Sequence, residues 1–140
     1  MLLLPQRLRR LFGRPLCLGW FDHPTMHAYR PPKHPDSPER VAAVEAECRR
    51  QGIWPHLLQI QGKEATDSQI ALAHSRSYLF RLEGMQPQTG KISRIDDDTV
   101  LTDNALEAAR IAAGTVIKAV DFVLAGKIRN AFCATRPPGH

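Results

Sequence analysis

Apolar residues along the chain gather in three short runs that are separated by stretches with helical spacing. The run at 15–21 lacks polar alternation, which is typical of a strand buried on both faces, and residues 57–60 and 129–135 are further candidate strands. Strands that alternate with helices indicate a parallel sheet covered by helices. We therefore expect an α/β fold in which the strand at 129–135 pairs in parallel with the strand near 16–21.

Helix signals lie between these candidate strands. Ser37 is a natural N-cap for a helix whose first position is Pro38, and Gly52 supplies its end. Apolar spacing predicts two shorter helices, at 66–73 and 77–82.

The longest predicted element is a helix from about Asn104 to Ala125. Its polar side chains form one narrow stripe, and almost all the other positions are apolar. We expect this helix to pack on the sheet and to be buried over most of its circumference, including the face of Ile111, Val116 and Val120. An aspartate at position 116 is then expected to cost several kcal/mol.

Residues 22–37 are rich in proline and histidine, which predicts a long, stiff loop. His23 and His27 have the i, i+4 spacing of a helical metal pair. Pro24 argues against a helix there, so a metal site at these histidines is disfavoured.

Composition places the chain among ordinary globular domains. The chain has 140 residues, of which 43% are hydrophobic and 24% charged, enough to build the core of one domain. Collagen-like, disordered and disulfide-scaffold classes are excluded, and no apolar run is long enough to cross a membrane. Three cysteines without a C-x-x-C pair favour a reducing, cytoplasmic compartment.

The net charge of +5 belongs mainly to an amino-terminal extension, residues 1–15, which holds four arginines and no acid. The rest of the chain, the domain at 16–140, is close to neutral. The extension fits a membrane-surface or transit-type helix, a phosphate-binding arm, or a frayed end before the first strand.

Candidate chemistry lies first at the end of the chain. The last predicted strand continues into Arg136, two prolines, Gly139 and His140. The prolines hold the strand exit extended and Gly139 permits a sharp turn, so His140 is held just past the carboxyl end of a parallel strand, where α/β sheets bind ligands. A surface turn with an incidental histidine is the alternative.

Three consecutive acids, residues 96–98, precede the longest helix. They either bind a cation or substrate amides, or form a solvated loop in which one of them or Asp103 caps the helix. His74 is either a site residue or a capping and packing residue. Phosphate-loop, dinucleotide, metalloprotease and serine-hydrolase motifs do not occur in the sequence.

Four segments, in order, resemble the histone deacetylase family, which includes bacterial deacetylase-like and acetylpolyamine amidohydrolases. They are HPDSPER at 34–40, AHS at 73–75 with Tyr78, IDDDT at 95–99 followed by AAG at 112–114, and NAFCATRPPGH at 130–140. The resemblance covers about residues 16–140 and implies a three-layer arginase/deacetylase-like fold with a mainly parallel sheet, of which this is the amino-terminal part.

The resemblance also implies an activity and a set of site residues. Family members hydrolyse acetyl-lysine or acetylated polyamines with a water activated by Zn²⁺. His140 matches the first histidine of the catalytic tandem pair, Asp98 the acid that binds the substrate backbone, Gly139 the acyl-lysine tunnel, and Arg40 the internal channel.

The family's second histidine, its zinc ligands and its transition-state tyrosine have no counterpart up to residue 140. We therefore expect a fragment that alone holds no zinc, releases no acetate, and is poorly soluble or loosely folded. Two other classes stay open: a non-catalytic binding or regulatory module on the same sheet, and a nucleic-acid binder anchored by the arginine arm. The near-neutral domain argues against the latter.

Overall fold

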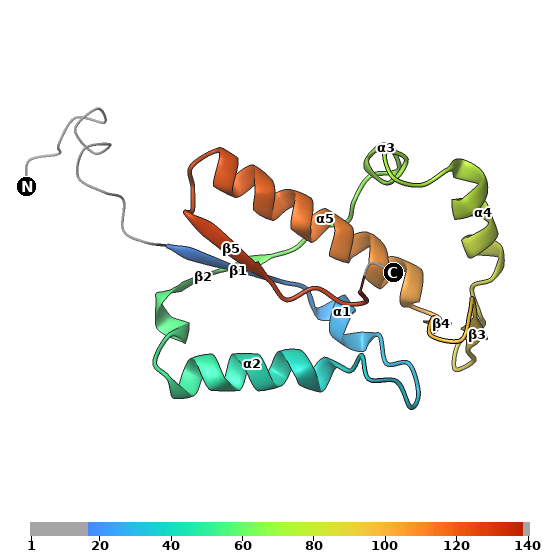
Figure 1. Ribbon diagram of the computed structural model, residues 1–140, viewed down its shortest axis with the longest axis horizontal. Helices are drawn as coiled ribbons and strands as arrows, with labels where there is room; N and C mark the ends of the chain where they lie inside the picture. The colour runs from blue at the N-terminus through green and yellow to red at the C-terminus, as the bar shows by residue number, and fades with distance from the viewer. Residues whose placement is uncertain (1–16, 139–140) are drawn as a thin grey trace, which may run out of the picture.

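The computed structural model describes residues 17–138. The amino-terminal extension, Gly139 and His140 therefore lie outside the described residues. Figure 1 shows the elements, which in chain order are β1 (Leu18–Asp22), α1 (Pro24–Ala28), α2 (Pro38–Arg50), η2 (Trp54–His56), β2 (Leu57–Gln61), α3 (Asp67–Ile70), α4 (Arg76–Gly84), β3 (Ser93–Arg94), β4 (Val100–Leu101), α5 (Ala105–Leu124) and β5 (Asn130–Cys133).

The main sheet has the order β2-β1-β5, and both pairings are parallel. Leu18 of the central strand lies opposite Leu57 on one side and Asn130 on the other. The expected parallel pairing of the last strand with the first is confirmed. Since all three strands run the same way, their carboxyl ends meet at one edge of the sheet.

Alternate residues of β1 build the two faces of the sheet. Phe21 is fully buried against α5, where its ring meets that of Phe122 edge to face at 5.7 Å. Trp20 points to the other face, stacks on Phe132 and meets Trp54 of η2. The chain is thus a mainly parallel α/β structure, with α5 on one face and η2, which follows α2, on the other.

Helix α5 packs on the sheet as expected, but it is not buried all round. Its buried residues are mostly small, and they include Ala108, Ala112 and Ala119. Ile111 is buried as expected, but Val116 is 43% exposed and Val120 is also exposed, so the prediction was wrong for these two positions. Small side chains let the helix lie close to the strands, whereas Val116 and Val120, one turn apart, lie on a side that the described segments leave largely exposed.

Residues 22–37 are not all loop, which corrects a second expectation. Pro24 occupies the first position of α1, where its missing N–H costs nothing. The two histidines of this segment have separate partners. The Nδ1 of His23 accepts from the N–H of Thr25, and the Nε2 of His27 lies 2.8 Å from the carboxylate of Asp22.

Strands β3 and β4 form an antiparallel hairpin that the sequence pattern did not indicate. The hairpin carries the three acids at its tip. Of the helices that the structure describes, none is long and apolar enough to cross a membrane. Cys17, Cys48 and Cys133 are free and half-buried.

Candidate functional site

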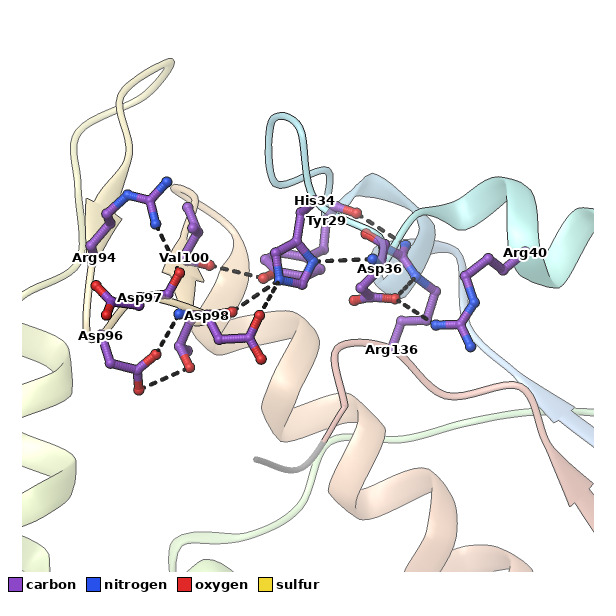
Figure 2. Close-up of polar contacts among 11 residues, drawn as sticks. Tyr29, His34, Asp36, Arg40, Arg94, Asp96, Asp97, Asp98, Val100 and Arg136 are labelled. Carbon is purple, nitrogen blue, oxygen red and sulfur yellow. Dashed lines mark hydrogen bonds and ion pairs between the residues drawn. The ribbon is translucent and has the colours of Figure 1, made fainter.

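Three segments that are distant in sequence meet beyond the carboxyl ends of β1 and β5. Figure 2 shows residues of the turn after α1, the exit of β5 and the β3–β4 loop in one cluster, with hydrogen bonds and ion pairs between them. This edge of a parallel sheet is the usual place for a ligand site in α/β folds.

Arg136 joins the exit of β5 to the turn after α1. Its side chain is buried, and its Nε and Nη2 donate to the Oδ1 and the backbone carbonyl of Asp36, each at 2.9 Å. Its Nη1 donates to the carbonyls of Met26 and Tyr29 at 3.1 and 3.0 Å. All three guanidinium nitrogens are therefore engaged, which compensates the charge of the buried Asp36 carboxylate and fixes the strand exit in one position.

Tyr29 links the same turn to the hairpin. Its hydroxyl donates to the carbonyl of Val100 in β4 over 2.8 Å. Burial raises the pKa of this tyrosine, and the nearby Asp36 carboxylate raises it further, so the hydroxyl keeps its proton and remains a donor.

Inside the hairpin loop, Asp96 is the organising residue. Its carboxylate accepts from the N–H of Asp98 at 2.9 Å and from the hydroxyl of Thr99 at 3.1 Å. Arg94 donates to the carbonyl of Asp97. The Asp96 carboxylate therefore stabilises the loop itself. None of the three acids caps α5, whose N-cap is Asn104.

Asp98 has a fixed backbone and an exposed carboxylate. His34, from the turn before α2, lies 2.9 Å through its Nε2 from the carbonyl oxygen of Asp98. The side chain of Asp98 itself is 77% exposed, with Oδ1 3.6 Å from the same nitrogen. An exposed carboxylate on a restrained backbone can accept N–H groups from a ligand.

Arg40 lies on the first turn of α2 at the border of this cluster. Its side chain is 70% exposed and its Nη1 is 3.8 Å from the Oδ1 of Asp36. The neighbouring Glu39 pairs with Arg30, and that hydrogen bond lowers the pKa of Glu39 to about 2. The structure thus brings Arg40 and Asp98 to the two sides of residues 34–36.

His74, which the sequence left open between a site role and packing, is exposed and stacks on the ring of Tyr78 at 5.3 Å. It takes no part in the hydrogen bonds of the cluster, but it belongs to the lining of the cavity described below. Gly139 and His140 lie outside the described residues. In contrast, His34 and Asp36 were not expected to be functional, although both belong to the HPDSPER segment that was singled out.

A cavity of about 460 Å³ adjoins the cluster between α4, α5 and the hairpin. Its walls are mainly apolar, and Tyr29, Asp96 and Pro137 border it. Among residues 17–138, no group of three His, Cys, Asp or Glu side chains could hold a metal ion. The described residues therefore do not fit the zinc that the resemblance implies.

The fold and the position of this cluster define an α/β domain with its site at the carboxyl edge of a parallel sheet. The Histone deacetylase domain matches residues 34–140, and the chain belongs to this family.

Individual proteins similar to this chain are also named as deacetylases or deacetylase-like amidohydrolases. The chain is 30% identical over 122 residues to the histone deacetylase-like amidohydrolase of Pseudomonas aeruginosa, a match that covers 87% of this chain and 30% of that protein. It is 33% identical over 111 residues to a probable deacetylase of Archaeoglobus fulgidus, which covers 78% and 30% of the two chains. The human polyamine deacetylase HDAC10 is 29% identical over 109 residues, 75% of this chain and 16% of the relative.

A solved structure shows the same fold. The crystal structure of the HDA15 HD domain superposes with a TM-score of 0.77 at 24% identity, over 89% of this chain and 36% of that one. The chain therefore spans less than two fifths of the length of each of these proteins.

Proposed function

We propose that this chain supplies substrate-positioning residues to a hydrolase that removes acetyl groups from acetylated lysine side chains or acetylated polyamines. Membership of a family of deacetylases supports the reaction class. The observation that carries the proposal is the Asp98 carboxylate, which is exposed at the carboxyl edge of the sheet while its backbone is held by other residues.

In this proposal Asp98 accepts N–H groups of the substrate backbone. A carboxylate offers strong, charge-assisted acceptors, and a restrained loop pays little entropy when the substrate binds. The neighbouring residues supply the restraint, since Asp96 and Arg94 hold the loop from within.

The remaining roles follow the family resemblance. Arg40 lines an internal channel, Gly139 lines the tunnel for the acyl-lysine, and His140 is the first histidine of the catalytic pair. The described residues contribute binding and positioning, and among residues 17–138 no group of three His, Cys, Asp or Glu side chains could hold a metal ion. The buried Arg136 fixes the backbone from which residues 139 and 140 continue.

The proposed substrate is a class, acetylated lysine side chains or acetylated polyamines, because the names of two relatives point to these two possibilities. One is named as a polyamine deacetylase and another as a histone deacetylase-like amidohydrolase. A peptide substrate presents backbone N–H groups that need a directed acceptor, whereas an acetylated polyamine has no peptide backbone and presents ammonium groups, which any nearby negative charge attracts. We therefore expect the loss of Asp98 to affect the peptide more than the polyamine.

The test uses protein expressed from the complete reading frame that contains this chain. Acetate release is measured from an acetyl-lysine peptide and from an acetylated polyamine, for the wild type and for Asp98→Ala. We expect KM for the peptide to rise by about tenfold or more in the variant, because a charge-assisted hydrogen bond is lost.

Asp97→Ala is the matched control. It removes a neighbouring exposed carboxylate and keeps the carbonyl that Arg94 binds, so turnover should be unchanged. A wild-type protein that binds the acetylated peptide without releasing acetate would contradict the hydrolase and favour a binding module. Equal effects of the two substitutions would contradict the role of Asp98.

A further inference from the structure

His34 makes a hydrogen bond at each ring nitrogen, to two different segments of the chain. Its Nδ1 accepts from the backbone N–H of Asp36 over 3.1 Å. A nitrogen that accepts has no proton, so in the neutral ring the proton is on Nε2. The Nε2–H then donates to the carbonyl oxygen of Asp98, 2.9 Å away and 64 residues along the chain.

The residues that hold His34 are themselves held by buried hydrogen bonds. The His34 side chain is only 14% exposed, and Asp36, whose N–H donates to the ring, is bound by the buried Arg136 through both its carboxylate and its carbonyl. Figure 2 shows His34 between the hairpin loop and this buried ion pair. His34 thereby connects the backbone of Asp98 to the buried ion pair at the sheet edge, while Tyr29 holds the hairpin two residues further on, at Val100.

The hydrogen bond is made to the backbone of Asp98, and although Oδ1 lies 3.6 Å from the same nitrogen, most of the side chain remains exposed. Since His34 binds the carbonyl, the carboxylate stays 77% exposed and available to a ligand. The bonds inside the loop set its shape, but they do not connect it to the sheet.

We propose that His34 is a positioning residue that anchors the backbone of Asp98 and so directs the Asp98 carboxylate toward peptide substrates. This inference rests on the proposed function in one respect, the role of Asp98 as a substrate acceptor. It predicts a residue that acts on substrate affinity without touching the substrate and only for substrates with backbone N–H groups.

Two substitutions separate the two hydrogen bonds of the ring. His34→Asn keeps an acceptor near the position of Nδ1 but is too short to reach Asp98. His34→Gln places an amide N–H near the position of Nε2 and can donate to the Asp98 carbonyl. His56→Asn, at an exposed position in η2, is the control for a histidine-to-asparagine change.

In the protein from the complete reading frame, His34→Asn should raise KM for the acetyl-lysine peptide about tenfold and leave kcat nearly unchanged. His34→Gln should restore most of the affinity, and neither variant should alter KM for an acetylated polyamine. In the double variant, His34→Asn should not raise KM beyond the value for Asp98→Ala alone, because both substitutions act through the contact between the Asp98 carboxylate and the peptide substrate.

A readout that needs no substrate separates failure of this inference from failure of the proposed function. Amide hydrogen exchange in residues 95–99 should become faster in His34→Asn and stay as in the wild type in His34→Gln and His56→Asn. Faster exchange in a protein that hydrolyses neither substrate contradicts the proposed function and supports the anchor. Unchanged exchange in His34→Asn overturns the anchor, whatever the activity.

Discussion

Arg136 and Arg40 both approach the same carboxylate oxygen of Asp36, yet their surroundings differ completely. Arg136 is buried and donates to four oxygen atoms, whereas Arg40 is mostly exposed and 3.8 Å away. A buried ion pair contributes little relative to a well-packed apolar pair, but removal of one partner leaves an uncompensated buried charge. An exposed pair is screened by water.

We therefore expect Arg136→Met to lower the free energy of unfolding of the protein from the complete reading frame by about 3–5 kcal/mol. Arg40→Met, the matched change on the same carboxylate, should lower it by less than about 1 kcal/mol. Urea unfolding followed by tryptophan fluorescence measures both values. Similar losses in the two variants would mean that burial does not decide the strength of this pair.

At the level of elements, the contact between α5 and the segment after β2 depends on the absence of a side chain. A Cβ added at Gly114 would lie closer than 3.0 Å to backbone atoms of Lys63, Glu64 and Ala65. The N–H of Ala65 also donates to the carbonyl of Arg110 in α5, at 3.0 Å. The glycine in the AAG segment thus permits a close approach of helix and chain.

Gly114→Ala should destabilise the chain by about 1–3 kcal/mol, although alanine favours helix formation, because the clash is with backbone that cannot rotate away. Gly84→Ala in α4 is the control, since nothing lies within 4 Å of its added Cβ, and it should leave stability unchanged or raise it by up to about 1 kcal/mol. Thermal unfolding of both variants measures the difference. A neutral Gly114→Ala would show that helix and segment can separate without cost.

For the molecule as a whole, the two sides of α5 have opposite surroundings. Ile111 is 5% exposed and packs with Met26 of α1, while Val116, Val120 and Leu124 form an exposed apolar stripe at intervals of four residues. A charge on the first side loses its hydration, whereas a charge on the second side keeps most of it.

Ile111→Asp should therefore cost more than about 3 kcal/mol, and Val116→Asp less than about 1 kcal/mol, in the 140-residue chain. The second value replaces the several kcal/mol that the sequence alone suggested. Urea unfolding of both variants provides the measurement. A large loss for Val116→Asp would indicate that this stripe is covered in solution.

The local pattern of the sequence determined the three parallel strands, the start of α2 at Pro38 and the length of α5. These features depend on periodicity and on the proline at the first helical position of α2, which act between neighbouring residues, although neither Ser37 nor Asn104 makes a side-chain capping hydrogen bond. The motifs also indicated the family and made Asp98 a candidate substrate-binding residue. Pro24 was misread, since the pattern could not distinguish a proline that begins a helix from one that prevents it.

Only the tertiary structure decided which residues meet. The strands of the hairpin have two residues each, too few to give a periodic signal. His34 and Asp98 are 64 residues apart, and Asp36 and Arg136 are 100 apart, so no local pattern pairs them. The sequence could not decide which face of α5 is buried for the same reason. Periodicity shows which positions are apolar but not which of them another segment covers.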